Sequence, residues 1–552
     1  MPSFQTDNLF RLIKTMTKSE KRSFKLYVNR IGGAETAKFI QLFDVLDKQK
    51  TYDEESIFIK IPSIKRSQLS NLKRHLYKQM LTSLRLIHIS KNVDIEIREQ
   101  IDFAKILYGK GLYLQSLKIL DRVKSIAINN HQDLLHLEIL EFIKIIEGRH
   151  ITNSIENRAD ELAQESANRT KILSRTTQLS NLTLKLYGYY LRFGHVKDKQ
   201  GAYAVEGIFK ANLPDVNPLN LTFFEKVYLY KAYVWYYNIL QNFPLFYRYT
   251  QKLVDLFDAN PDMKVQERDI YMRALNNLLT ALFYTTYYPK FTATLSQFEE
   301  FIADNQKSFN TNTEIQAFLY IYTAKINKHF IEGSFSEGLK LVPELKNQLK
   351  KFAPYLDHHR ILIFQYKIAC MYFGSGDNGS AIDYLNEIIY FKAGQLRTDI
   401  QCYARILHLI AHYELGHVNL LEYLVKSVYR FLAKMEDLNA VQKEILRFLR
   451  RELYSNPERQ HKAFINLKNN LSKLRQQDYA GRSFLYLDIS AWLQSKIEGR
   501  TVEEVSRENF LKGKRDWKLR IKNEKLRIKS KDFGQLFRVI ILYFCSKLQR
   551  MH

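Results

Sequence analysis

The chain has 552 residues, of which only 20 are Gly and 10 are Pro, and its formal net charge at pH 7 is +26. Few helix-breaking residues beside abundant Leu, Ile, Lys and Glu favour long helices over sheet. The three cysteines, Cys370, Cys402 and Cys545, lie far apart. This spacing excludes a disulfide framework and a cysteine metal knuckle, and it fits a reducing compartment.

The N-terminal part of the chain has the pattern of a small basic helical module. Thr17 and Glu20 have the spacing of a capping box, which starts the second of two short helices. An amphipathic helix follows at 36–49, and Pro62 ends the next short helix. Apolar residues at spacings of three and four then predict a long helix to about Ile87. A short helix, a proline turn and a long basic helix in this order resemble a helix-turn-helix or winged-helix unit.

The long helix lies between Glu55 and Asp94, in a stretch without any acidic residue. Counterion release favours a cation at each phosphate, and a helix fits the major groove of DNA. DNA or RNA would therefore contact Lys65, Arg66, Arg74, Lys78 and Arg85. The alternative is a solvated face on a helix that packs against the next part of the chain. Aromatic residues do not interleave there as a surface for single strands requires.

From about residue 93 a pattern of small and large residues recurs. After Ala104 come a large residue, a Gly, an aromatic, a small and a large residue, at offsets of three, seven, nine, twelve and sixteen. The Gly would end the first helix of a hairpin in a left-handed cap, and the small residue would mark the closest approach of two helices. The predicted packing residues are Ala104, Gly111, Ser116, Gly333, Gly338, Ala369, Tyr372, Gly376, Ala381 and Gly416.

This recurring pattern, which we call the ladder, resembles the tetratricopeptide repeat, which places small and aromatic residues at similar offsets. Gly333, Gly376 and Gly416 are 43 and 40 residues apart, whereas the family period is about 34. The resemblance is therefore to the wider group of tetratricopeptide-like repeats. It implies an all-α fold in which helical hairpins stack into a right-handed superhelix. The inner surface of such a superhelix would bind an extended peptide or a partner helix.

Two blocks also resemble a group of uncharacterised Bacteroidota proteins built on such repeats. They are FRLIKTMTKSEKRSFKLYV at 10–28 and HYELGHVNLLEYLVKSVYRFL at 412–432. This resemblance covers most of the chain to about residue 508, and it implies no activity.

The chain is expected to have four parts: the basic module 1–92, a first half of the repeats at 93–302, a second half at 303–508 and a basic extension at 509–552. Between Arg507 and Lys531 stand eleven Lys/Arg and three acidic residues. A polyanion would contact Lys514, Arg515, Lys518, Arg520 and Lys522. The alternative for this tail is a solvated terminal helix or a disordered arm.

No motif in the sequence indicates catalysis. His408 and His412 have the i,i+4 spacing of helical metal ligands, but Leu409 stands where a zinc protease needs Glu, and no third ligand is evident. Asp357 and the two histidines after it lack the further Asp and His clusters of a phosphoesterase. The sequence has no phosphate-binding Gly loop and no Gly-x-Ser-x-Gly elbow. We therefore expect no enzyme, no cofactor and no metal.

Localisation and partners follow from the same patterns. The N-terminus has no apolar run before a cleavage site, and the apolar run 539–545 is far shorter than the roughly 20 residues that span a bilayer. We expect a cytoplasmic protein without a membrane span. Its expected function is that of a non-enzymatic scaffold or adaptor for a protein or peptide. The alternative is a regulator that binds DNA or RNA through the N-terminal module, and the sequence does not indicate the oligomeric state.

Overall fold

The computed structural model describes residues 7–32, 34–89, 92–149, 158–217, 220–391, 398–435, 440–452, 457–475 and 489–513. Every regular element in these segments is a helix, which confirms the predicted all-α class. The predicted polyanion contacts of the tail lie outside the described residues: Lys514, Arg515, Lys518, Arg520 and Lys522.

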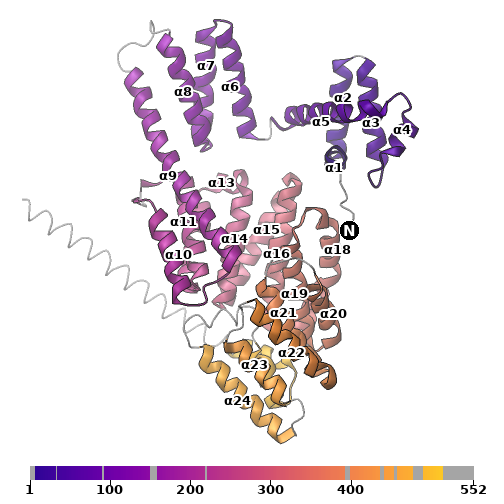
Figure 1. The fold of residues 1–552 in the computed structure, drawn as a ribbon. Coiled ribbons are helices and arrows are strands. Elements are labelled where there is room, and N and C mark those ends of the chain that lie inside the picture. The colour runs from indigo at the N-terminus through magenta and orange to yellow at the C-terminus, as the bar shows by residue number, and fades with distance from the viewer. Residues whose placement is uncertain are drawn as a thin grey trace, which may run out of the picture. The chain divides into compact units, whose positions relative to one another are not determined.

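The chain divides into two compact units, and Figure 1 labels most of their helices. The first unit comprises Met1–Thr177 and Thr222–Glu225, and the second comprises Gln178–Leu221 and Lys226–His552. The division falls inside α9 (Arg158–Phe193), a single helix of 36 residues. Both units therefore contain part of this one long helix.

The first five helices pack around one core. They are α1 (Asn8–Thr15), α2 (Lys18–Ile31), α3 (Ala34–Lys48), α4 (Glu55–Lys60) and α5 (Arg66–His88). The Thr17 hydroxyl accepts from the backbone N–H of Glu20, and the Glu20 carboxylate accepts from that of Thr17, so a capping box starts α2. Helix α5 packs on α1, α2 and α3, and it buries Leu69, Leu76 and Met80. These helices thus form a module with its own core.

Three further helices, the start of α9 and the short segment Thr222–Glu225 complete the first unit. The three helices are α6 (Val93–Gly109), α7 (Tyr113–Asn129) and α8 (Asp133–Arg149). Helices α6 and α7 pack as a hairpin whose buried Ser116 hydroxyl donates to the carbonyl oxygen of Ala104 at 2.8 Å. The small residue of the ladder therefore lies at the contact between the two helices.

The second unit is a succession of helices that pack on their neighbours in sequence. They are α10 (Lys199–Asn212), α11 (Phe223–Ile239), α12 (Phe243–Asp258), α13 (Pro261–Gln266), α14 (Arg268–Tyr284), α15 (Tyr288–Asn305), α16 (Thr311–Glu332), α17 (Phe335–Gly338), α18 (Val342–Phe352), α19 (His358–Ser375), α20 (Asn378–Ile389), α21 (Thr398–Glu414), α22 (Val418–Lys434), α23 (Ala440–Glu452), α24 (Pro457–Arg475) and α26 (Ser490–Glu498). Pairs such as α14–α15, α19–α20 and α21–α22 form hairpins. The first helix of a hairpin also packs on the first helix of the next, as α14 does on α16 and α19 on α21.

A residue in the left-handed conformation ends many of these helices. Where the ladder supplies glycine, the residues are Gly111 (φ +78°), Gly333 (φ +62°), Gly376 (φ +91°) and Gly416 (φ +70°). Three other turns use non-glycine residues with φ between 53° and 58°, namely His131, Gln241 and Thr286. The same turn geometry therefore recurs where the sequence pattern is degenerate.

The remaining small residues of the ladders lie at helix contacts. Ala369 and Ala381 are fully buried in α19 and α20. A Cβ at Gly338 would lie 2.9 Å from Sδ of Met371, so a side chain there would collide with α19. Tyr372 is half-buried, and its ring stacks on a tyrosine ring of α20 with 5.6 Å between centroids.

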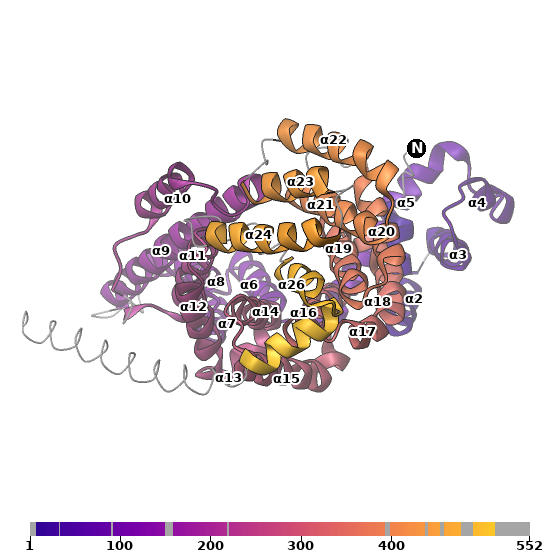
Figure 2. The same ribbon diagram turned by 90° about the horizontal axis from the view of Figure 1, so that it is seen from below.

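The last described segment, 489–513, returns to earlier hairpins of the second unit, and we call it the C-terminal strap (Figure 2). In α26 the indole Nε1 of Trp492 donates to Glu414 Oε1 at 2.7 Å, at the end of α21. Lys496 pairs with the other oxygen of the same carboxylate. The strap is thus anchored to the turn that joins α21 and α22.

A second strap helix, at 502–513, packs on the turn between α16 and α17. Glu503 Oε1 accepts from the backbone N–H of Ser336 at 2.9 Å. A Cβ on Gly333 would lie 2.6 Å from the strap backbone, so the helix sits directly against this glycine. The Phe510 ring meets Tyr288 edge-on at 4.9 Å, which extends the contact to the start of α15.

Candidate functional site

The outer side of α5 carries three of the basic residues that the sequence predicted as nucleic-acid contacts. Arg74, Lys78 and Arg85 are exposed, and their spacings of four and seven place them on one side of the helix. The buried Leu76 lies on the opposite side. Arg85 is 3.6 Å from Asp102, but both side chains are half exposed, so this pair is weak. The module therefore presents a cationic helix face to solvent.

Lys65 and Arg66 stand at the start of α5 in different surroundings. Arg66 donates to both oxygens of Glu55, at 2.8 and 2.5 Å, and its guanidinium lies 4.8 Å from the centroid of the Phe58 ring. Lys65 is the exposed N-cap residue. A phosphate would therefore meet Lys65 directly, whereas Arg66 already holds a carboxylate in bidentate geometry.

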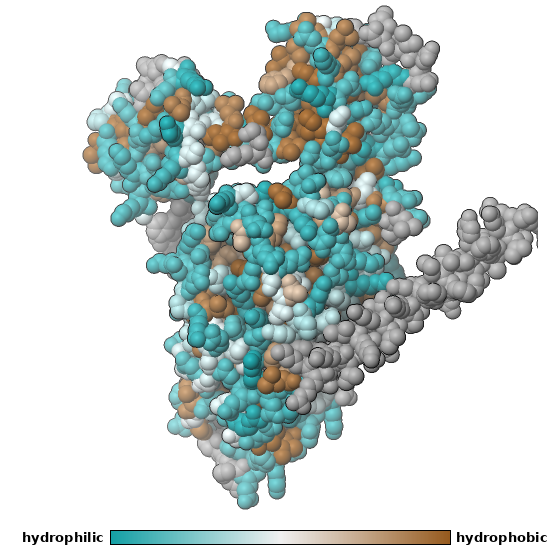
Figure 3. Space-filling model, turned by 180° about the vertical axis from the view of Figure 1, so that it is seen from behind, coloured by the Kyte–Doolittle hydropathy of each residue, from teal (hydrophilic) through white to brown (hydrophobic). Residues whose placement is uncertain are grey.

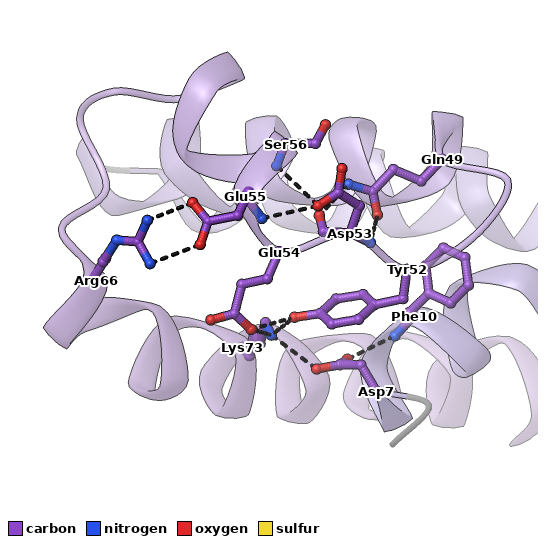
Figure 4. A network of polar contacts seen from close by, with 10 residues as sticks. All are labelled: Asp7, Phe10, Gln49, Tyr52, Asp53, Glu54, Glu55, Ser56, Arg66 and Lys73. Carbon is purple, nitrogen blue, oxygen red and sulfur yellow. Dashed lines mark hydrogen bonds and ion pairs between the residues drawn. The ribbon is translucent and has the colours of Figure 1, made fainter. Parts of the chain in front are cut away.

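Lys73 belongs to the same basic stretch but points into the module (Figure 4). Its ammonium lies 3.0 Å from Asp7 Oδ2 and 3.2 Å from Glu54 Oε2, and it donates to the Tyr52 hydroxyl. Burial alone would lower the pKa of Lys73, but the hydrogen bonds with Tyr52 and Asp7 outweigh it, so the pKa of Lys73 is raised. For the Tyr52 hydroxyl, burial acts in the other direction and raises the pKa to about 12. These contacts join the start of the chain, α4 and α5, so Lys73 holds the module together.

A second candidate site lies on the first helices α14, α16 and α19. The Lys367 ammonium donates to Asn327 Oδ1 at 2.6 Å, and it lies 5.4 Å from the ring centroid of Phe330 and 5.8 Å from that of Phe283. The side chain is half-buried, and desolvation lowers the pKa of Lys367 to about 8. No carboxylate of the described residues pairs with this ammonium. Among the described side chains, three helices thus surround this cation with one amide oxygen and two rings.

Helix α11 carries another desolvated cation. Burial, together with the charge of Arg273 on α14, lowers the pKa of Lys231 to about 8. The ammonium lies 4.8 Å from the centroid of the Tyr228 ring, and within the described part of the chain it forms no ion pair. Cations that have rings but no carboxylate beside them can accept an anionic group of a ligand.

His408 and His412 of α21, which have the i,i+4 spacing of metal ligands, are buried, and their row of imidazoles continues to the exposed His417. His412 Nε2 is 3.2 Å from His408 Nε2, and His412 Nδ1 is 2.8 Å from His417 Nδ1. Burial, together with the neighbouring charges of His412 and Arg405, lowers the pKa of His408 to about 4. Among the residues that the structure describes, no three His, Cys, Asp or Glu side chains are placed to hold a metal ion. The row is therefore a set of packed rings linked by their nitrogens.

Large apolar side chains are exposed on α6–α8, and Figure 3 shows hydrophobic surface over these helices. Phe103 and Ile106 of α6 are 43% and 56% exposed, and Leu134 and Ile145 of α8 are 65% and 51% exposed. Phe103 and Ile106 are one helical turn apart, so they share a face of α6. Exposed apolar groups of this kind are typical of protein contact surfaces.

A comparison with models of protein families finds none that matches the chain, and a comparison with curated proteins finds no match. In the described segments no helix is both long and apolar enough to cross a membrane.

The Lys367 site is not evident from the sequence, because its residues come from three separate hairpins. Phe283, Asn327 and Lys367 are 44 and 40 residues apart, which is close to the spacing of the ladder glycines. That period was the one available signal, since residues a repeat apart lie on neighbouring first helices. Nothing local to Lys367 distinguishes it from an exposed lysine.

Proposed function

We propose that this chain is a non-enzymatic scaffold that binds a protein or peptide across the first helices of its hairpins. In this proposal the hairpins stack into a right-handed superhelix of the tetratricopeptide-like kind, with α11, α14, α16 and α19 toward the ligand. The protein acts without a cofactor or metal, in the cytoplasm.

The observation that carries the proposal is the ammonium of Lys367. A cation that loses water without gaining a carboxylate lowers the stability of the free protein. An acidic side chain or a backbone carbonyl of a bound peptide would supply the missing acceptor. The Phe283 and Phe330 rings beside it offer apolar contact to the same peptide.

The exposed apolar side chains of α6–α8 give independent support for a protein partner. Phe103 and Ile106 lie on the first helix of a hairpin. Interfaces between proteins are enriched in such aromatic and large aliphatic anchors, whereas nucleic-acid surfaces are strongly cationic.

The proposal is tested by capturing partners from a cell extract that has been treated with nuclease. We expect the parent protein to retain a partner that Lys367→Met loses, because the variant removes the cation but keeps the apolar stem. Lys340→Met is the matched control, because Lys340 is 73% exposed and pairs only with its neighbour Glu337 among the described residues. A partner that nuclease removes, or that Lys367→Met retains at full strength, would contradict the proposal.

A second candidate function is a nucleic-acid-binding regulator, and it is favoured by the cationic face of α5. Replacing Arg74, Lys78 and Arg85 with Glu should abolish binding of generic DNA or RNA by this module, and binding by the parent should weaken steeply with salt. The control reverses three exposed cations of α1 and α2, namely Arg11, Lys18 and Arg22. Equal binding by the α5 variant and the parent would reject this candidate.

A further inference from the structure

The α23–α24 hairpin concentrates positive charge far from α5 in the sequence. Residues 440–475 contain nine Lys/Arg and three acidic residues. On α23 four cations are exposed, Lys443, Arg447, Arg450 and Arg451, and the last three stand four, seven and eight residues after Lys443. This spacing places them along one side of the helix. The opposite side buries Ile445, Leu446, Phe448 and Leu449 in the core.

One contact shows how the two helices share a surface. Asn470 of α24 donates to Glu444 Oε2 of α23 at 3.2 Å, and Arg447 donates to the other oxygen of this carboxylate. Lys473 follows Asn470 by three residues, and Lys462 precedes it by eight. Both lysines therefore lie on the same side of α24 as Asn470. Figure 2 shows α22, α23 and α24 side by side, and each pair of neighbours is in contact. The cations of α23 and α24 therefore form one continuous face.

The cations of this face are mostly without acidic partners. Lys443, Arg450, Arg451, Lys462 and Lys473 are exposed and form no ion pair with any residue that the structure describes. Arg447 contacts only Glu444 among the described carboxylates, and that pair also serves the contact between the helices. Surfaces that serve solubility alone intersperse both signs of charge. Here a single sign prevails across two helices.

We propose that this face binds the sugar–phosphate backbone of a nucleic acid through Lys443, Arg447, Arg450, Arg451, Lys462 and Lys473. A rise of about 1.5 Å per residue makes α23 roughly 20 Å long, and it sets Lys443, Arg447 and Arg451 at intervals of about 6 Å. Each strand of a duplex presents one phosphate per about 3.4 Å of the axis, so a backbone laid along the helix offers a phosphate near every cation. Neighbouring helices pack about 8–10 Å apart, so α24 supplies a second row of cations.

The chemistry of the face favours nucleic acid over an acidic protein. Protein interfaces depend on buried aromatic or aliphatic anchors. Of the described residues on α23 and α24, Ile465 is the one large apolar side chain that is exposed, at 37%. The face instead offers exposed amides at Asn466 and Asn469, and amides commonly donate to phosphate oxygens. Backbone contacts of this kind predict binding with little dependence on base sequence.

The test measures fluorescence anisotropy of the full chain with a labelled single-stranded RNA and a labelled duplex DNA, each about 20 nucleotides or base pairs long, as salt is varied. The hairpin variant carries Arg450→Glu, Arg451→Glu, Lys462→Glu and Lys473→Glu, which spares the Arg447–Glu444 contact. We expect at least about tenfold weaker binding near 100 mM salt, and a log–log salt slope reduced by about three to four units on duplex.

The control variant makes the same change in net charge elsewhere in the second unit, at Lys199, Lys307, Lys340 and Lys350. We expect this variant to bind within about twofold of the parent, because long-range charge alone is screened beyond about 10 Å at this salt. Equal weakening by both variants, or unchanged binding by the hairpin variant, would overturn the proposal. Displacement of the nucleic acid by poly-glutamate at an equal concentration of charge would overturn it too, because the face would then suit an acidic protein.

A second set of variants separates loss of charge from loss of structure. The same four positions changed to Gln should keep the helicity of the parent by circular dichroism and lose about half as much of the salt slope as the Glu set. Reversal of Arg74, Lys78 and Arg85 on α5 should leave the loss caused by the hairpin variant unchanged, because the two surfaces share no residue. If the hairpin variant loses binding only when α5 is also reversed, the assignment to α23–α24 is wrong.

Discussion

A lysine in the position of Lys367 lowers the stability of the fold that contains it. Its ammonium has lost water, and among the described side chains it has gained one amide oxygen and the faces of two rings. Cation–π contacts and a neutral hydrogen bond together offset only part of the desolvation of a charge. A residue retained for packing alone would be apolar here, so this local penalty supports a role in binding.

Replacing Lys367 with Met should therefore stabilise the protein at neutral pH. The folded-state pKa is about 8 against an unfolded value near 10.5, so between those values the unfolded chain binds a proton that the native state does not. The stability of the parent thus falls as the pH drops from about 10.5 to 8, and below 8 the penalty is complete. We expect Lys367→Met to gain about 1–3 kcal/mol at pH 7 in urea unfolding, and much less at pH 10. A gain equal at both pH values, or none at pH 7, would show that the ammonium is not desolvated.

Single turn residues show how far the hairpins could be predicted. Gly111, Gly376 and Gly416 were predicted as left-handed caps because glycine adopts positive φ without strain. Gln241 and Thr286 also adopt positive φ, but neither residue type indicates this conformation in the sequence. The packing of the helices imposes these turns, so local propensity could not reveal them.

Thr286 gives the sharpest test, because a β-branched residue is strained at positive φ. Its φ is +53°. Thr286→Gly should relieve this strain and raise the stability by about 0.5–1 kcal/mol, although the unfolded chain of the variant also gains freedom. Thr285→Gly is the matched control, because its φ is −86° and no strain is relieved. The melting temperature should fall in the order Thr286→Gly, parent, Thr285→Gly. A higher melting temperature for Thr285→Gly than for Thr286→Gly would refute the assignment of strain.

At the scale of elements, the packing of the C-terminal strap is the feature that could not be predicted from the sequence. Glu503 and Ser336 are 167 residues apart, and their contact depends on how the intervening hairpins stack. The α23–α24 face is the opposite case. Its four cations on α23 fall on one side of a helix, and this pattern is visible in the sequence. Glu444 interrupts the run of positive charge, however, so the hairpin lacks the acid-free stretch that distinguishes α5.

A comparison of two glycines, both in the left-handed region, tests how closely the strap packs. Gly333 and Gly376 both end a first helix at positive φ, but a Cβ on Gly376 meets nothing within 4 Å, whereas one on Gly333 would lie 2.6 Å from the strap backbone. Gly376→Ala should therefore cost about 1 kcal/mol of conformational strain. Gly333→Ala should cost clearly more, about 2–4 kcal/mol, because the 502–513 helix must shift or detach.

The readout is hydrogen exchange of the strap together with denaturant unfolding of both variants. Gly333→Ala should speed exchange in 502–513, and Gly376→Ala should not. Equal stability losses with unchanged exchange would mean that the strap does not press on Gly333 in solution.

At the scale of the whole molecule, the chain is two compact units that share one helix. Helical arrays are held together mainly by contacts between neighbouring elements, so cooperativity falls off with distance along the array. The two units have separate buried clusters, with Ile143 in the core of the first and Leu278 buried in the second. Unfolding of such a chain is expected to depart from a single two-state transition.

Large-to-small substitutions in each core test this division. Ile143→Ala and Leu278→Ala each remove buried methyl groups and should each cost about 2–5 kcal/mol in the unit that contains them. We expect denaturant unfolding to show two steps, with Ile143→Ala moving one and Leu278→Ala moving the other, because the lost contacts lie within one unit each. Helix α9 runs through the division at Thr177, so its two halves should lose protection from hydrogen exchange in different steps. A single transition that both variants shift equally would mean that α9 transmits stability along its full length, and that the two units fold as one.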